Sequence, residues 1–168
     1  MQIKHTIDMK SNETKKVLIA LDYDPTAQKV AETGYSFANA MGAEVILLHV
    51  ISDPVYYASP DYSPVMGFTG FMDMGPLTLD SAEGLKRASH NYLLRISQHL
   101  HDESIKLLVK EGDYASTILE TATTLHADAI VMGTHSRKWL EKILMGSVTE
   151  EIIGQSSIPL FIIPTKKQ

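Results

Sequence analysis

The amino-acid sequence predicts an α/β fold: a single doubly wound sheet of five parallel strands with helices on both faces. Five short apolar runs alternate with segments in which apolar residues recur at helical spacing, and this alternation is typical of successive βα units. The second run, EVILLHVI at 44–51, is apolar almost throughout, which favours a strand buried on both faces of a parallel sheet. Because crossovers between parallel strands are right-handed, such units place helices on both sides of the sheet.

Length and composition favour one globular domain. The chain has 168 residues, of which 44% are hydrophobic and 21% charged, and these fractions are ordinary for folded domains. The formal charge of -5 argues against nucleic acid as a partner. The sequence contains no cysteine, which excludes disulfides, zinc ribbons and iron-sulfur clusters. No apolar run approaches the ~18 residues of a membrane helix, so we expect a cytoplasmic protein without membrane insertion.

Two segments lack the alternation of strands and helices. Residues 1–15 are polar and aperiodic, so we expect a flexible leader before a domain that spans 16–168. Residues 52–79 contain four prolines, three glycines and five aromatic residues, which predicts a long loop inserted into the domain. Loops of this length are uncommon unless they are functional or disordered. A partly ordered surface insertion, a lid over a site and a partner-binding element all remain open.

The first βα unit has clear boundary signals. The first strand is the apolar run at 17–21. Asp24 is the expected N-cap of the helix that follows, and Pro25 is its expected first residue, where the missing N–H costs nothing. Gly42 is the expected end of this helix, and the second strand follows at 44–51.

The rest of the chain continues the pattern with three further helices and three further strands. The expected elements are a helix at 79–100, a strand at 104–109, a helix at 114–125, a strand at 128–132, a helix at 147–155 and a strand at 158–163.

Ligands of doubly wound sheets bind beyond the carboxyl ends of the strands, where the strand order reverses. The first strand-to-helix turn contains neither the dinucleotide fingerprint nor the Walker sequence. Asp22 follows the first strand, and its carboxylate can accept hydrogen bonds from sugar hydroxyls or hold a divalent cation. We expect His49 to be a hydrogen-bonded core histidine. His99 and His101 stand two residues apart and point to different faces of a helix, which disfavours a shared metal.

The segment from Met132 to Thr149 is the most informative part of the chain. Glycine or serine recurs at Gly133, Ser136 and Gly146, and Gly146 is followed by Ser147. One interpretation is a capping box, in which the oxygen of Ser147 and the side chain of the glutamate three residues later satisfy backbone N–H groups of a helix. The other is a phosphate site, in which the N–H groups of the same turn and the helix dipole hold phosphate oxygens.

These residues resemble the universal stress protein family, in particular its nucleotide-binding branch. The motif of that branch is Gly, two residues, Gly, nine residues and Gly followed by Ser or Thr. The spacing here is the same, with Ser136 in place of the middle glycine. The similarity extends over 16–164. It implies a sheet ordered 3-2-1-4-5 and a homodimer formed through the C-terminal strand at 158–163.

The resemblance also implies an adenine nucleotide as the ligand. This is ATP, with ADP and AMP as alternatives, and Mg²⁺ or Mn²⁺ is carried by the nucleotide. Asp22 and Val50 would contact the adenine and ribose end, and Gly133 with His135 and Ser136 would frame the ribose and phosphates. Gly146 and the three residues after it would hold the phosphates. The implied cofactor-binding residues are Leu21, Asp22, Val50, Met132, Gly133, His135, Ser136, Gly146, Ser147, Val148 and Thr149.

The function that this resemblance favours is an ATP-binding sensor or modulator of the stress response. The sequence offers no general base aimed at an attacking water, so we expect slow ATP hydrolysis or autophosphorylation at most, with Ser147 and Thr149 as the first hydroxyls to test. Two residues depart from the family pattern: Ser136, and Tyr23 where the family usually has glycine. The alternative function is a dimeric interaction module that binds no nucleotide and acts on a partner protein through 52–79.

Overall fold

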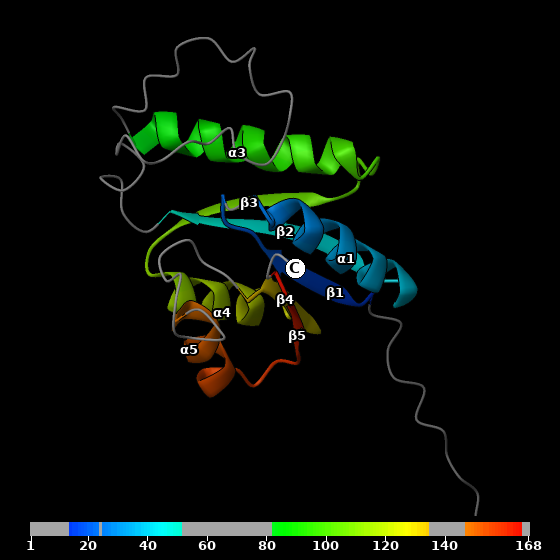
Figure 1. Cartoon of the computed structure of the whole chain (residues 1–168), viewed down its shortest axis with the longest axis vertical. Coiled ribbons are helices and arrows are strands. Elements are labelled where there is room, and N and C mark those ends of the chain that lie inside the picture. The colour runs from blue at the N-terminus through cyan, green and yellow to red at the C-terminus, as the bar shows by residue number, and fades with distance from the viewer. Residues whose placement is uncertain (1–13, 24, 52–81, 135–146, 166–168) are drawn as a thin grey trace, which may run out of the picture.

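The computed structural model describes residues 14–23, 25–51, 82–134 and 147–165, in which five strands and four helices alternate (Figure 1). In chain order they are β1 (Lys16–Ala20), α1 (Ala27–Ala40), β2 (Glu44–Ile51), α3 (Ala82–His99), β3 (Lys106–Glu111), α4 (Tyr114–Thr124), β4 (Ala129–Gly133), α5 (Ser147–Gln155) and β5 (Leu160–Ile163). Residues 1–13 of the predicted leader and the predicted insertion at 52–79 lie outside the described ranges.

The five strands form one parallel sheet in the order β3-β2-β1-β4-β5, so the predicted fold class and strand order are confirmed. β1 is the central strand, and its residue Ile19 lies opposite Leu47 of β2 and Val131 of β4. The chain winds outward from β1 to β3 and then returns to add β4 and β5 on the other side. The strand order therefore reverses between β1 and β4, where doubly wound sheets bind their ligands.

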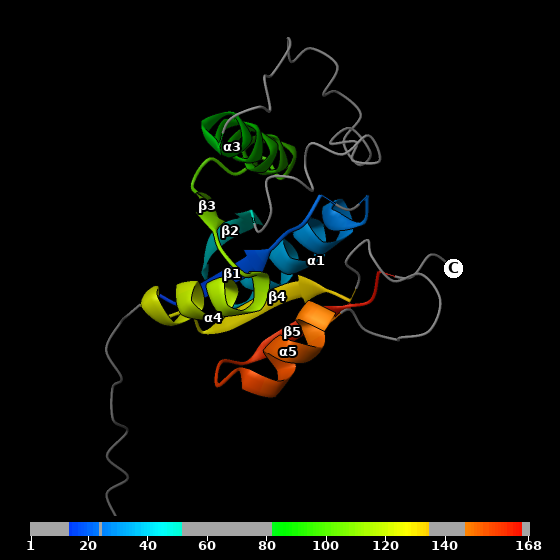
Figure 2. The same cartoon turned by 90° about the vertical axis from the view of Figure 1, so that its left-hand side faces the viewer.

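The sheet buries both of its faces against helices. Val17 and Ile19 of β1 pack in the layer that includes α1 and α3, and Leu18 between them packs in the layer of α4 and α5. All three side chains are fully buried. Figure 2 shows the sheet between these two helix layers. This explains the continuous apolar runs of the central strands, because successive side chains enter opposite cores.

Close packing of α1 on the sheet requires a glycine. A Cβ atom on Gly34 would lie 2.9 Å from Cγ1 of Val131 and 3.0 Å from Cδ1 of Ile19.

The end of α1 is marked by Gly42, as predicted. This glycine follows the C-cap residue Met41, and its φ of 62° is the left-handed conformation that favours glycine. The N–H of Ala43 then donates back to the carbonyl of Ala38 at 3.0 Å. This helix is thereby held in one position above β1 and β4.

The predicted start of α1 is wrong. The helix begins at Ala27 with Thr26 as its N-cap, so Pro25 precedes the helix and is not its first residue. Asp24, the predicted N-cap, lies outside the described residues. The first helical hydrogen bond runs from the N–H of Val30 to the carbonyl of Thr26 at 3.2 Å. Ala27 is also the first helical residue buried against the sheet, so docking sets the start of the helix more strongly than the Asp-Pro signal.

β3 lies two residues later than the predicted strand at 104–109. Its pairing with β2 runs from Lys106, opposite Ile46, to Glu111, opposite Ile51. The apolar run ends at Val109, but the strand continues to Glu111. Pairing with β2 depends on backbone hydrogen bonds, which charged residues such as Lys110 and Glu111 can also make. No helix in the described ranges has the length and apolar composition needed to cross a membrane.

Candidate functional site

The candidate site lies at the carboxyl ends of β1 and β4. Because Ile19 pairs with Val131, the residues that follow β1 lie beside the last residues of β4. Leu21, Asp22 and Tyr23 leave β1 at this edge, and Gly133 ends β4 there. The sheet thus brings together two segments that are more than one hundred residues apart in the sequence.

The backbone of the segment after β1 is held by specific hydrogen bonds. The N–H of Leu21 donates to the carbonyl of Leu48 in β2 at 2.9 Å, and the carbonyl of Leu21 contacts Nδ1 of His49 at 2.8 Å. The carbonyl of Asp22 accepts a 2.6 Å hydrogen bond from the hydroxyl of Tyr92 in α3. β2 and α3 therefore fix the peptide units on both sides of Asp22, a half-buried residue at the edge of the sheet.

His49 is a buried neutral histidine. Its side chain is 2% exposed, and burial lowers its pKa to about 4. Because a carbonyl only accepts, Nδ1 carries the proton and donates it to the carbonyl of Leu21. The sequence-based prediction of a hydrogen-bonded core histidine is confirmed. Its hydrogen bond orients the residue just before Asp22.

Tyr23, the residue found where the family usually has glycine, packs into the same cluster. Its ring centroid lies 4.2 Å from that of His49 and 4.5 Å from that of Tyr92, and both pairs are tilted. Its hydroxyl donates to Oγ of Ser89 in α3 at 2.8 Å. The tyrosine therefore has a structural role of its own, as an anchor of the segment after β1 on α3.

On the other side of the site, Gly133 is required by packing. A Cβ atom at this position would lie 2.9 Å from Cγ2 of Val30 and 2.9 Å from Cγ2 of Thr165. The next residue, Thr134, donates its N–H to the carbonyl of Ile163 at 3.0 Å and accepts from the N–H of Thr165 at 3.1 Å. The glycine thus needs no ligand to explain it, and the end of β4 is held by main-chain and short side-chain contacts.

The first turn of α5 is attached to the end of β4. The hydroxyl of Thr149 donates to the carbonyl of Gly133 at 3.2 Å, and the residue is 2% exposed. Its neighbour Val148 packs against the core on the α4 side of the sheet. The amino end of α5 is therefore held next to β4, and the first four N–H groups of a helix have no partner within the helix. Such N–H groups, together with the helix dipole, can bind an anion.

The described residues of the predicted site gather at this edge of the sheet. Leu21, Val50 and Met132 are almost fully buried, so their side chains serve the two cores as well as any site. Outside the described residues lie His135, Ser136, Gly146 and the side chain of Ser147. The choice between a capping box and a phosphate site at Ser147 therefore stays a prediction.

Sequence reasoning missed the polar contacts that α3 makes at the site. Ser89 and Tyr92 fall within the helix expected at 79–100, and the sequence singles out neither as a site residue. Helical spacing indicates which face is buried, but it does not indicate that a hydroxyl on that face reaches a carbonyl 70 residues earlier. In the part of the chain that the structure describes, no group of three or more His, Asp or Glu side chains is arranged to hold a metal ion.

The strand order and the helices on both faces define a doubly wound α/β protein whose strand order reverses between β1 and β4. The chain belongs to the universal stress protein family, whose model matches residues 13–164. It is 28% identical over 155 residues to universal stress protein MJ0577 of Methanocaldococcus jannaschii. This match covers 90% of this chain and 96% of that protein. Universal stress protein MJ0531 of the same organism is 30% identical over 159 residues, 94% of this chain and 86% of that protein.

Solved structures of the family share the fold. The structure of MJ0577 superimposes with a TM-score of 0.68 at 26% identity and covers 92% of this chain and 98% of that chain. Universal stress protein UspA of Lactobacillus plantarum gives a TM-score of 0.64 at 20% identity, and the match covers 90% of this chain and 99% of that chain. A universal stress protein solved in complex with cAMP gives a TM-score of 0.57 at 16% identity, and the match covers 90% of this chain and 98% of that chain.

Proposed function

We propose that this protein binds an adenine nucleotide, ATP first among them, between the carboxyl ends of β1 and β4, and acts in the cytoplasm as a sensor or modulator of the stress response. One observation carries the proposal: Thr149 ties the amino end of α5 to Gly133 of β4, beside the segment that contains Asp22. This places a carboxylate and a helix amino end at the reversal of strand order. Family membership and the cAMP complex of a structural relative support a nucleotide as the ligand.

Each part of this edge suits a different part of a nucleotide. The Asp22 carboxylate is suited to accept hydrogen bonds from the ribose hydroxyls, with Leu21, Val50 and Met132 beside the adenine. The first turn of α5 is suited to the phosphates, together with Gly133 and the segment that contains His135, Ser136 and Gly146. Mg²⁺ or Mn²⁺ would be held mainly by phosphate oxygens and water.

We assign no efficient catalysis to this site. The hydroxyl proton of Thr149 is used in the hydrogen bond to Gly133, and the residue is buried, so it is a poor acceptor for a phosphoryl group. Ser147 at the start of α5 is the better candidate for slow autophosphorylation. Nucleotide binding is then the function to test first.

The test is calorimetric titration of the protein with Mg-ATP, using two matched variants. Asp22→Asn removes the negative charge at the proposed ribose end, and we expect about ten-fold weaker binding, since hydrogen bonds to charged groups contribute about 1.5–3 kcal/mol. Asp128→Asn is the control, because Asp128 lies at the amino ends of β1 and β4, away from the proposed site. Its carboxylate accepts there from the N–H of Lys16. Equal affinity of both variants and the wild type would contradict the role of Asp22.

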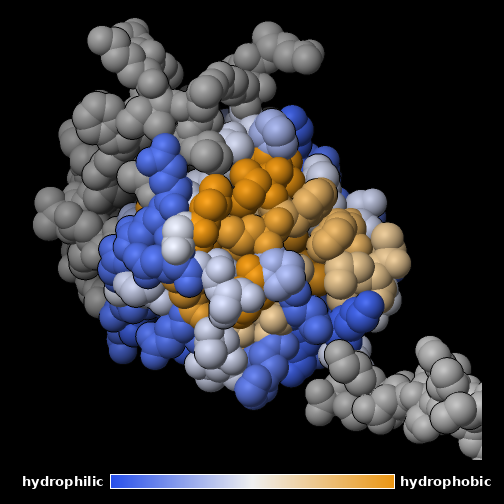
Figure 3. All heavy atoms as spheres, turned by 90° about the horizontal axis from the view of Figure 1, so that it is seen from below, coloured by the Kyte–Doolittle hydropathy of each residue, from blue (hydrophilic) through white to orange (hydrophobic). Residues whose placement is uncertain are grey.

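We further propose a homodimer through β5 and α5, because the two edges of the sheet differ. The edge strand β3 carries exposed Lys106, Lys110 and Glu111, which discourage pairing with another strand. The other edge strand, β5, consists of LFII and is only partly covered. Seen from below, the side on which α5 and β5 lie in Figure 1, the surface carries a central hydrophobic patch bordered by hydrophilic residues (Figure 3). Such an uncovered apolar edge favours pairing with a second copy.

Two exposed apolar residues provide a test of the dimer. Ile153 on α5 is 45% exposed and Leu94 on α3 is 39% exposed, so neither is a core residue. We expect Ile153→Asp to convert the protein from dimer to monomer in sedimentation or light scattering, while Leu94→Asp leaves the dimer intact. A monomeric wild type, a dimer that survives Ile153→Asp, or a dimer that breaks with Leu94→Asp would contradict the assigned interface.

A further inference from the structure

Three consecutive residues after β1 are each held by a side chain from another element. His49 of β2 binds the carbonyl of Leu21, Tyr92 of α3 binds the carbonyl of Asp22, and Ser89 of α3 accepts from the hydroxyl of Tyr23. Two of the three contacts come from one face of α3, where Ser89 and Tyr92 are 1% and 3% exposed. This segment is therefore fixed by a helix that contributes none of the predicted ligand-binding residues.

We infer that Tyr92, supported by Ser89, is a positioning residue for the nucleoside end of the site: its hydrogen bond to the Asp22 carbonyl sets the direction in which the Asp22 carboxylate is presented. The inference rests on the proposed function. A peptide unit rotates as a plane, so a carbonyl held at 2.6 Å on one side fixes the adjoining backbone dihedrals and thereby the base of the Asp22 side chain. α3 would act on the ligand through Asp22 and without contacting it.

The phenol of Tyr92 has little freedom to move. Its ring lies 4.5 Å from the ring of Tyr23 and 5.9 Å from that of His49, measured between centroids. Interiors packed in this way leave few alternative rotamers. Loss of the hydroxyl alone would leave the ring in place and remove the bond to the carbonyl of Asp22. The inference therefore concerns one atom, Oη of Tyr92.

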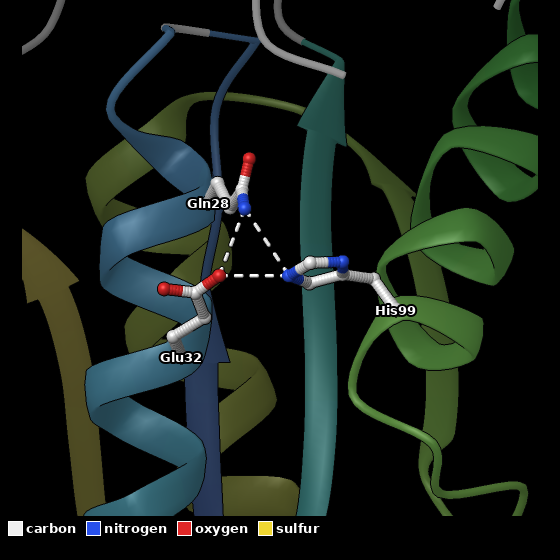
Figure 4. A network of polar contacts seen from close by, with 3 residues as sticks. All are labelled: Gln28, Glu32 and His99. Atoms are coloured by element: carbon white, nitrogen blue, oxygen red, sulfur yellow. Dashed lines mark hydrogen bonds and ion pairs between the residues drawn. The ribbon is translucent and has the colours of Figure 1, made fainter. Parts of the chain in front are cut away.

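The carboxyl end of α3 is anchored independently on α1. His99 lies 2.7 Å from Oε1 of Glu32, and Nε2 of Gln28 donates to the same oxygen at 2.8 Å (Figure 4). These two hydrogen bonds lower the pKa of Glu32. Just beyond the helix, the hydroxyl of Tyr35 in α1 donates to Oδ2 of Asp102 at 2.9 Å. α3 thus rests on α1 at its carboxyl end and holds the Asp22 segment through Ser89 and Tyr92 in its middle turns.

Tyr35 provides a matched control for Tyr92. Each tyrosine donates one hydroxyl across the same layer of the protein, but only Tyr92 donates to the segment after β1. Tyr92→Phe and Tyr35→Phe therefore remove the same chemical group from two places. A merely structural role of Tyr92 would make the two variants alike in nucleotide binding.

The experiment is titration of the full chain and both variants with Mg-ATP and with AMP. We expect Tyr92→Phe to bind both nucleotides about five-fold more weakly, by the same factor, because the lost positioning concerns the adenosine that they share. Tyr35→Phe should bind as the wild type does. Unchanged affinity of Tyr92→Phe, or an equal loss in Tyr35→Phe, would overturn the inference.

A second measurement keeps this result separate from the fate of the proposed function. A hydrogen bond to the Asp22 carbonyl polarises the peptide group that contains the N–H of Tyr23. Tyr92→Phe should therefore shift the amide resonance of Tyr23 in the NMR spectrum of the nucleotide-free protein, and Tyr35→Phe should not. Failure of the wild type to bind nucleotide would overturn the proposed function, and with it the role of Tyr92 in positioning Asp22 for the ligand. An unshifted Tyr23 amide would overturn the contact itself.

If Tyr92→Phe does not fold, Tyr23→Phe removes the neighbouring bond to Ser89 and is tested in the same way.

Discussion

The two sides of the candidate site are built differently. On the β1 side, side chains from β2 and α3 hold the segment after β1: His49 and Tyr92 contact its backbone carbonyls, and Ser89 contacts the hydroxyl of Tyr23. On the β4 side, Gly133 fits against Val30 and Thr165 with no room for a side chain. The first side depends on hydrogen bonds and on one titratable ring, and the second depends on size. The two sides should therefore respond to different perturbations.

Acid should affect the β1 side most. The pKa of His49 is about 4 in the folded protein, against an ordinary value of 6.5, so between these pH values the unfolded chain binds more protons than the folded one. The stability contributed by neutral His49 is present above pH 6.5 and is lost as the pH falls towards 4, by up to about 3 kcal/mol. Urea unfolding of the wild type and of His49→Asn at several pH values measures this difference.

The control for this prediction lies in the substitution itself. Asn keeps an N–H donor near the position of Nδ1 but has no group that titrates in this range. We expect His49→Asn to be less stable at pH 7 and to have a flatter dependence on pH. A variant with the same pH dependence as the wild type would show that other groups dominate acid unfolding.

Added volume should affect the β4 side most. Gly133→Ala places a methyl group 2.9 Å from Val30 and Thr165, and we expect a loss of about 2 kcal/mol in the free energy of unfolding, typical of an overpacked core. Gly154→Ala in α5 is the control, because among the described residues no atom beyond its chain neighbours and its own helix backbone lies within 4 Å of its Cβ position. That variant should gain about 0.5–1 kcal/mol, since alanine favours a helix over glycine. Equal effects of the two substitutions would contradict the close fit at the end of β4.

The link between β4 and α5 should give the smallest effect. Thr149→Val removes the hydroxyl that donates to Gly133, and we expect a loss of about 1 kcal/mol in unfolding free energy. Binding of Mg-ATP should weaken more than binding of AMP, because the shifted helix end faces the additional phosphates. Thr121→Val is the control, since the hydroxyl of Thr121 bonds only within its own helix, to the carbonyl of Thr117. An equal change in ATP and AMP affinity would contradict the phosphate role of α5.

The sequence predicts the fold well, because the central strands β1, β2 and β4 bury both faces and read as apolar runs. It predicts the boundaries less well where pairing or docking overrides a local signal, as at Pro25 and at the end of β3. In the site, the resemblance points to Asp22 and Gly133. The contacts that hold them come from Tyr92 and Thr165, which are distant in the sequence and carry no local signal of their role.

The central claim is that this edge of the sheet binds an adenine nucleotide. The most direct test is to denature the purified protein, identify any released nucleotide by chromatography, and titrate the emptied and refolded protein with Mg-ATP in a calorimeter. We predict a bound adenine nucleotide, or saturable binding with micromolar affinity, and this result would show that Ser136 is tolerated in the motif. An empty protein that gives no heat of binding would contradict the claim and favour the alternative, a dimeric module that acts on partner proteins.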